Sequence, residues 1–127
     1  MKLILRLLEG RFAVCRLDAD APVPPGLLTD KHEFVSVTRT ADELSVVCAE
    51  SLAPAGAKVQ KGWRAFKLQG PLDFSLTGVL SSLLRPLAEA KISVFTVATY
   101  DTDYILVREP ELAAATAVLK QHAEVLN

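Results

Sequence analysis

The sequence lacks the features that identify several large classes of protein. Only 2 of its 127 residues are cysteine, too few for a disulfide scaffold, and Cys15 and Cys48 are too far apart for a CxxC motif. No apolar run approaches the roughly 20 residues of a membrane-spanning helix. Residues 1–8 briefly resemble a signal peptide, but charged residues from Arg6 onward interrupt the apolar stretch too early. We therefore expect a reduced, cytoplasmic protein without a membrane partner.

An excess of charge of one sign is missing too. The chain has 14 Lys and Arg against 15 Asp and Glu, a formal net charge of −1. This balance gives no reason to expect a nucleic-acid partner or an anionic membrane. Half of the residues are hydrophobic, so a disordered chain is excluded, because that much apolar surface collapses. At about 150 residues per domain, the length allows one compact unit or two very small ones.

Signatures of catalysis and of metal or nucleotide binding are also absent. His32 and His122 have no Cys, Asp or Glu at metal-ligand spacing. The sequence has no GxSxG, GxxxxGK[ST] or GxGxxG motif. Cys15 and Cys48 lie in or beside apolar strands, which favours buried structural thiols over nucleophiles. We expect no metal, no cofactor and no enzymatic activity.

Apolar patterns predict an α+β fold. A helical stripe begins at Val79, with Ser75 or Thr77 as its cap, and Pro86 should bend this helix rather than end it. Pro110 should open a last helix, which frays near the end of the sequence. The fraying end of that helix is predicted at residues 122–127. Alternating or β-branched runs predict strands at residues 11–17, 34–38, 44–48, 63–68, 92–97 and 104–107.

An internal echo recurs at an offset of sixty residues. Residues 35–47 and 95–107 both read as strand, polar turn with an acidic residue, strand. The echo predicts two β-α-β-β-like halves of a ferredoxin-like sandwich, 1–60 and 61–127, with the first helix eroded by proline. The alternative to duplication is that two similar hairpins occur by chance. Each half alone is too small for a good core, so we expect the halves to share a sheet or to pack face to face.

The first candidate site is the strand-to-helix loop at residues 73–79. It contains Asp73, two hydroxyl side chains and Gly78. A helix start presents unpaired N–H groups and a partial positive charge, which suit a carboxylate. Gly78 would let a ligand approach the backbone closely. The alternative is structural: Ser75 and Thr77 cap the helix, and Gly78 relieves a tight turn.

The second candidate site is the turn at residues 99–103, between two apolar strands. Its two carboxylates lie within three positions. They repel each other unless a cation neutralises them or amide donors bind them. Asp101 or Asp103 would supply the countercharge for an ammonium or guanidinium group. Tyr100 adds an aromatic wall. The alternative is a solvated hairpin tip whose aspartates bond their own backbone.

Residues 73–109 resemble an ACT domain, a small ligand-binding regulatory module, and the closest likeness is to the ACT_7-type, CASTOR-like group. The likeness extends more weakly to residues 33–47. The residues that carry it are Thr77-Gly78-Val79-Leu80, Leu84-Arg85-Pro86-Leu87-Ala88-Glu89, Ile92-Ser93-Val94 and the run from Thr99 to Glu109.

The resemblance implies a tandem pair of βαββαβ units with antiparallel sheets and helices on one face, the first unit being degenerate. In the related eukaryotic arginine sensors, an amino acid is held at the interface between ACT modules. By that analogy, Asp103 is the residue that meets a ligand cation. The implied ligand-binding residues are Asp73, Thr77, Gly78, Val79, Ser93 and Val94 on one wall, and Thr99, Tyr100, Asp101, Thr102 and Asp103 on the other.

The leading hypothesis is therefore a cytoplasmic, non-enzymatic regulatory protein that binds an amino acid. Because the sensor's pocket joins two modules and this chain is half that length, a homodimer or larger homo-oligomer is expected to complete the pocket. The first alternative is an assembly module that has lost its ligand and only pairs with a partner protein. The second is an enzyme that uses Asp73, Asp101 or Asp103 as a general acid or base, although no sequence feature selects one of them.

Overall fold

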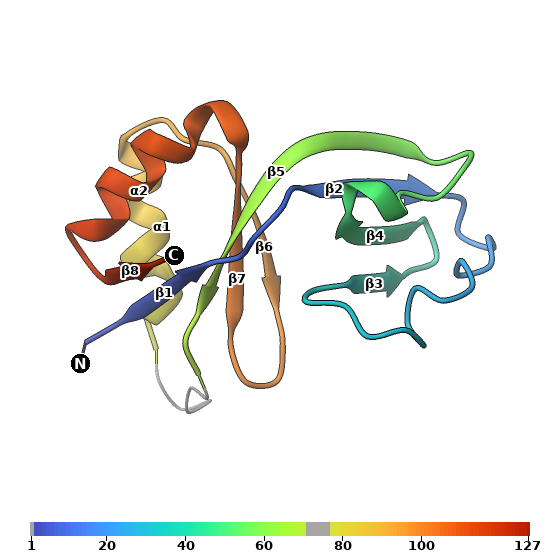
Figure 1. The fold of residues 1–127 in the computed structure, drawn as a ribbon, viewed down its shortest axis with the longest axis horizontal. Coiled ribbons are helices and arrows are strands. Elements are labelled where there is room, and N and C mark those ends of the chain that lie inside the picture. Colours follow the sequence, from blue (N-terminus) through green and yellow to red (C-terminus); the bar gives the residue numbers. More distant parts are fainter. Residues whose placement is uncertain (1, 71–76) are drawn as a thin grey trace. The chain divides into compact units, whose positions relative to one another are not determined.

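The protein is seen in a computed structural model that describes residues 2–70 and 77–127 (Figure 1). The chain forms two compact units. One consists of residues 1–9 and 64–127 and is called the terminal unit; the other, residues 10–63, is called the inserted unit. Strand β5 (Lys58–Leu68) begins in the inserted unit and ends in the terminal unit.

The terminal unit is a mixed sheet with two helices. Its strand order is β8-β1-β5-β7-β6, where β1 runs antiparallel to β5 and parallel to β8, and β6 and β7 form an antiparallel hairpin. Besides the end of β5, its elements are β1 (Ile4–Leu7), α1 (Val79–Glu89), β6 (Val94–Ala98), β7 (Asp103–Arg108), the 3-10 helix η2 (Glu109–Glu111), α2 (Leu112–Lys120) and β8 (Glu124–Leu126).

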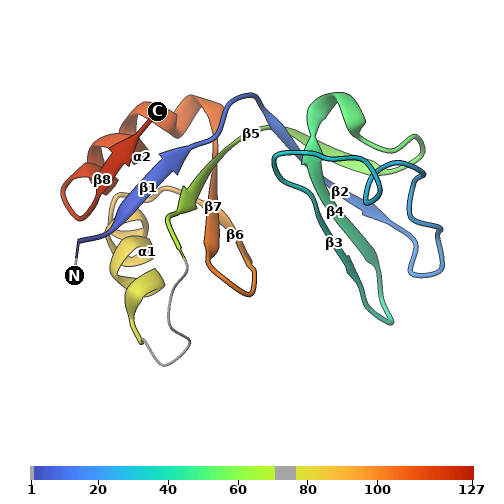
Figure 2. The ribbon, with the colours of Figure 1, turned by 60° about the horizontal axis from the view of Figure 1, so that its bottom comes forward.

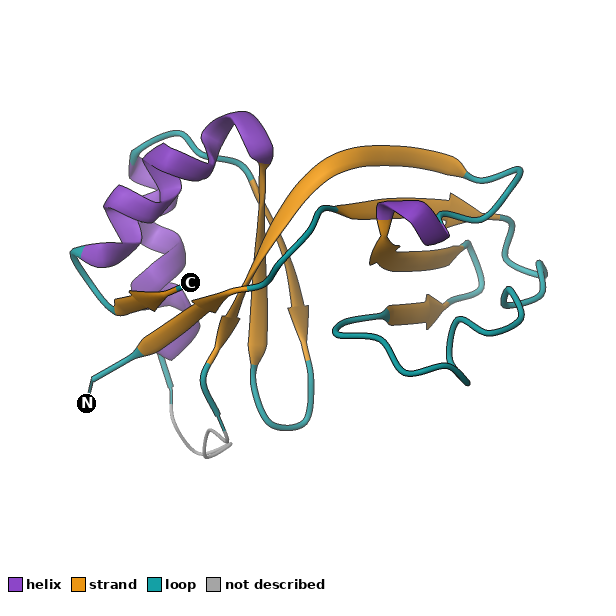
Figure 3. Cartoon of the chain, viewed as in Figure 1, coloured by secondary structure: helices purple, strands orange, loops and turns teal. Residues whose placement is uncertain are grey.

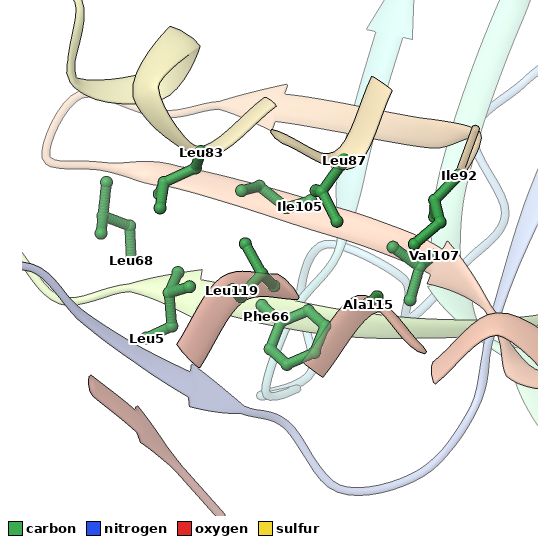
Figure 4. Packing of buried hydrophobic residues seen from close by; sticks show 10 residues of the cluster. All are labelled: Leu5, Phe66, Leu68, Leu83, Leu87, Ile92, Ile105, Val107, Ala115 and Leu119. Carbon is green, nitrogen blue, oxygen red and sulfur yellow. The ribbon is translucent and has the colours of Figure 1, made fainter. Parts of the chain in front are cut away.

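Both helices pack on the same face of this sheet (Figures 2 and 4). Leu83 and Leu87 are four residues apart on α1, as Ala115 and Leu119 are on α2, so each pair lies on one side of its helix. The strands contribute alternate residues to the same cluster: Leu5, Phe66, Leu68, Ile105 and Val107. The predicted α+β class is thereby confirmed.

Helix α1 begins and ends with left-handed residues. Gly78 is its N-cap at φ 75°, and no side chain caps the helix, so the predicted Thr77 cap is wrong; Ser75 lies outside the described residues. Gly78 starts the helix through its backbone conformation, because glycine adopts the left-handed region at no steric cost. The helix continues through Pro86, as expected. Lys91, at φ 62°, follows its last turn.

The last residues do not fray as predicted. Residues 124–126 form β8, which pairs with β1: Leu5 lies opposite Val125, and the Glu124 N–H donates to the Leu3 carbonyl at 2.9 Å. Val125 packs against the core of the terminal unit, and burial together with the ladder bonds orders the segment. β1 was not predicted either. Through it, residues 1–9 belong to the terminal unit, whereas the sequence division placed them with 10–60.

The inserted unit contains strands and a single short helix (Figure 3). Its order is β3-β4-β2-β5, with every pairing antiparallel. A separate core forms around buried Cys15, Val46 and Cys48. Its elements, besides the first part of β5, are β2 (Phe12–Leu17), β3 (Ser36–Arg39), β4 (Leu44–Ala49) and the 3-10 helix η1 (Glu50–Leu52).

Both hairpins of the sequence echo are present, but in different registers. Val37 pairs with Val46 in the β3–β4 hairpin. At the position sixty residues later, Val97 pairs with Tyr104, two residues away from the equivalent partner. The predicted hairpins are confirmed, while duplication of one ancestral half stays a prediction.

Candidate functional site

An open groove of about 730 Å³ lies in the terminal unit, between α1 and the turn that joins β6 to β7. It brings together parts of both segments that the sequence singled out. From the α1 side it is lined by Gly78, Val79, Leu80, Ser81, Leu84, Arg85 and Ala88, and from the hairpin side by Ala98, Thr99, Tyr100, Asp101, Thr102 and Asp103.

The α1 wall combines the helix start with an apolar stretch. The first backbone bond of the helix runs from the Ser82 N–H to the Gly78 carbonyl at 3.0 Å, so the N–H groups before Ser82 have no partner within the helix. Leu80 and Leu84 are half-buried and pack against the core. This wall therefore offers amide donors at one end and apolar surface beyond them.

The hairpin wall is held by threonines. The Thr99 N–H donates to the Thr102 carbonyl at 2.8 Å, and the Thr102 N–H donates to Thr99 Oγ1 at 3.3 Å. The buried Thr102 hydroxyl donates to the Leu68 carbonyl, which ties the turn to the end of β5. Among the described residues, neither Asp101 nor Asp103 uses its carboxylate to hold the turn. This differs from the alternative in which the aspartates of a solvated hairpin tip bond their own backbone. Both carboxylates are thus available to a ligand.

Gly70 supports the same turn from below. A Cβ atom at Gly70 would lie 2.8 Å from the Asp101 carbonyl oxygen and 3.2 Å from the Thr102 Cβ. Such a contact with backbone is too close for any side chain, so only glycine lets β5 and the turn approach this far. This role of Gly70 could not be predicted from the sequence, because it depends on a contact between segments far apart in the chain.

The sequence-predicted site residues fall into three groups. Gly78, Val79 and the turn at 99–103 line the groove. Thr77, Ser93 and Val94 are described but do not line it. Asp73 lies outside the described residues. The part of all these residues in ligand binding stays a prediction.

Sequence reasoning missed six lining residues. Ser81, Arg85 and Ala88 follow Gly78 at helical spacing, so the period of α1 was the available signal for that wall. The six are Leu80, Ser81, Leu84, Arg85, Ala88 and Ala98.

The two cysteines form a buried pair in the inserted unit. Burial raises the pKa of Cys15, and burial together with the neighbouring Cys15 raises the pKa of Cys48 to about 12. A thiol is a nucleophile only as the thiolate, so these shifts disfavour nucleophilic chemistry at Cys48.

Metal clusters and membrane-spanning helices are both missing from the described residues. Residues 2–70 and 77–127 contain no group of three or more His, Cys, Asp or Glu arranged to hold a metal. Within the same ranges, no helix has the length and apolar character needed to cross a membrane.

Comparison with family models gives two matches. A model of the ACT domain matches residues 58–121. A second model, which describes an N-terminal domain, matches residues 10–55. The first match spans the terminal unit from β5 to the end of α2, including both walls of the groove.

Individual proteins are similar as well. The human putative protein CASTOR3P is 31% identical over 107 residues, which cover 84% of this chain and 62% of that protein. The bovine cytosolic arginine sensor for mTORC1 subunit 1 is 33% identical over 104 residues, 73% of this chain and 32% of the sensor. The chain therefore spans less than two thirds of the length of these relatives. A crystal structure from Agrobacterium tumefaciens superposes with a TM-score of 0.89 at 37% identity, over 99% of this chain and 93% of that one.

Proposed function

Because this chain belongs to the ACT domain family, we propose that it is a non-enzymatic regulatory protein that binds a free amino acid in the groove beside α1. One observation carries the proposal. The groove joins a helix start, which suits a carboxylate, to a turn with two aspartates, which suit an ammonium group.

A zwitterion fits this arrangement chemically. Its ammonium group would lie against Asp101 and Asp103, and its carboxylate on the α1 wall. An apolar ligand side chain would extend along half-buried Leu84 and exposed Ala88. Both charges of the ligand would then keep polar partners as it leaves water, which is the condition for burying them.

Arginine is the first amino acid to test. The bovine relative is named as an arginine sensor. Two carboxylates on the turn also match a ligand with two cationic groups, since one can take the α-ammonium and the other a guanidinium. A neutral amino acid would leave one of the aspartates without a counter-ion.

The proposal extends to a second copy of the chain. The groove is open, and Tyr100 in its lining is 80% exposed. Strand β6 pairs with β7 in the described sheet, and its residues are uncharged, a composition that suits pairing with a strand of a second copy. We propose a homodimer in which a second ACT unit covers the ligand, within a cytoplasmic protein whose inserted unit is a degenerate ACT-like domain. A ligand at such an interface regulates by its differential affinity for two arrangements of the units.

The test is binding by the whole chain. Thermal unfolding against the twenty common amino acids, followed by calorimetric titration of those that raise the melting temperature, should identify at least one ligand. Asp103→Ala should weaken that ligand by about 1–3 kcal/mol with the fold intact, because it removes the partner of a cation. Asp20→Ala, an exposed carboxylate of the inserted unit, is the matched control and should bind as the wild type does.

Two results would count against the proposal. A flat thermal response across the panel, with a dimer in light scattering, would favour the assembly module that has no ligand. Wild-type affinity in Asp103→Ala, as in Asp20→Ala, would show that the ligand binds without Asp103 and would place the binding site outside the groove.

A further inference from the structure

We propose that Arg85 makes the groove select an amino acid over the amine that lacks its carboxylate, by binding the α-carboxylate of the ligand. The inference rests on the proposed function, because it assigns a role within the same groove. Arg85 lies on the exposed side of α1 and lines the groove.

The charges of the groove single out Arg85. Three of its lining side chains are formally charged: Arg85, Asp101 and Asp103. Within residues 2–70 and 77–127, no hydrogen bond or ion pair engages any of these three side chains. Glu89, four residues along the helix from Arg85, is in position for a helical ion pair but does not form one. The Arg85 guanidinium is therefore the one cationic group of the described lining, and no described residue forms a hydrogen bond or ion pair with it.

Without Arg85, the described lining would carry two negative charges and no positive side chain. Such a groove attracts the ammonium of any amine and repels a carboxylate, since both effects come from the same Coulomb interaction. The α1 start offers only a partial positive charge, which acts over the first turn and is weakened by solvent in an open groove. Arg85 adds a full positive charge to this partial one, which strengthens the attraction for a carboxylate beside Asp101 and Asp103.

The position of Arg85 on the helix suits this task. Gly78, Ser81 and Arg85 follow at intervals of three and four residues, so they share one face of α1. Arg85 lies about 10 Å along the helix axis from Gly78, and helical side chains lean toward the N-terminus of their helix. The planar guanidinium binds a carboxylate through two parallel hydrogen bonds, which an ammonium side chain does not reproduce.

The test compares each amino acid with its decarboxylated amine. Arginine with agmatine, lysine with cadaverine and leucine with isopentylamine are titrated calorimetrically into the wild type, Arg85→Gln and Arg85→Lys. Lys120→Gln, an exposed cation at the end of α2 that does not line the groove, is the matched control. The wild type should bind at least one amino acid more tightly than its amine.

Arg85→Gln should weaken that amino acid by about tenfold or more and leave the amine unchanged or tighter. Arg85→Lys should fall between the two, because it keeps the charge and loses the planar fork. Lys120→Gln should match the wild type. All variants should unfold at the wild-type temperature, since Arg85 is exposed.

Several outcomes would overturn the inference. Equal weakening of an amino acid and its amine would mean that Arg85 acts by packing. Unchanged affinity for the amino acid in Arg85→Gln would place the carboxylate elsewhere, with the proposed function still standing. If the wild type bound none of the six compounds, the inference would fail together with the proposed function for these ligands.

Discussion

At the scale of single residues, two positions hold the turn of the candidate site in place. Thr102 is buried and donates its hydroxyl to the Leu68 carbonyl, and Gly70 lets the turn approach β5 closely. Together they fix where Asp101 and Asp103 stand relative to α1. The turn is thus positioned by the sheet and not by its own aspartates.

Replacing Thr102 tests this positioning. Thr102→Val keeps the shape but leaves the Leu68 carbonyl without its donor, so the free energy of unfolding should fall by about 1–3 kcal/mol. Thr102→Ser retains the hydroxyl and should recover most of that loss. Urea unfolding of the three proteins measures the difference. Equal stability of the valine and wild-type proteins would show that the bond contributes nothing to stability.

Sequence reasoning identified single residues of the site where the signal was local. Asp101 and Asp103 stand out because two carboxylates share one turn, and Gly78 because it precedes a clear helical stripe. The helical period places Arg85 on the same face of α1 as Gly78, but an exposed arginine on a helix is ordinary until a hairpin from elsewhere in the chain is found beside it. Gly70 was invisible for the same reason.

At the scale of elements, α1 owes its boundaries to backbone conformation. Its C-terminus is a Schellman motif: the Ile92 N–H donates to the Leu87 carbonyl and the Lys91 N–H to the Ala88 carbonyl, both at 2.9 Å. Lys91 occupies the left-handed position where glycine is the preferred residue.

Lys91→Gly should therefore stabilise the protein. Removing the side chain relieves the left-handed strain, and we expect a gain of about 0.5–1 kcal/mol in the free energy of unfolding. Lys91→Val, a β-branched residue at the same position, should destabilise it. Thermal and urea unfolding of both variants provide the measurement, and a glycine variant less stable than the wild type would contradict the assignment.

Elements with a strong local period were predictable, and those that depend on distant partners were not. Helix α1 and both hairpins follow from apolar spacing and polar turns. Strands β1 and β8 have four and three residues, too few for a period to be recognised. They form because β8 pairs with β1 and β1 pairs with β5. The first part of β5 is exposed and polar, so alternation did not reveal it.

At the scale of the whole molecule, the two units have separate cores. Leu5 is fully buried in the core of the terminal unit, and Leu44 is fully buried in that of the inserted unit. We propose that these units are domains that open separately, with the boundary near residue 60 that the sequence suggested and with residues 1–9 joined to the later unit.

Truncating one core residue from each unit tests this proposal. Leu5→Ala and Leu44→Ala should each cost about 2–5 kcal/mol, since both remove a buried side chain and leave a cavity. Amide hydrogen exchange should then accelerate in α1 and α2 for Leu5→Ala, and in β3 and β4 for Leu44→Ala. Acceleration across all four elements in both variants would show that the chain opens as one cooperative unit.

The place of β1 between β5 and β8 has a consequence for biosynthesis. During translation, β1 leaves the ribosome before either of the strands that flank it, whereas every strand of the inserted unit is complete once β5 has been made. The inserted unit can close while the nascent chain is still growing. Strand β1 can pair with β5 at that stage, but its other edge must stay unpaired until β8 has been synthesised. A pause in translation after β5 would prolong the exposure of that strand to chaperones and to other nascent chains.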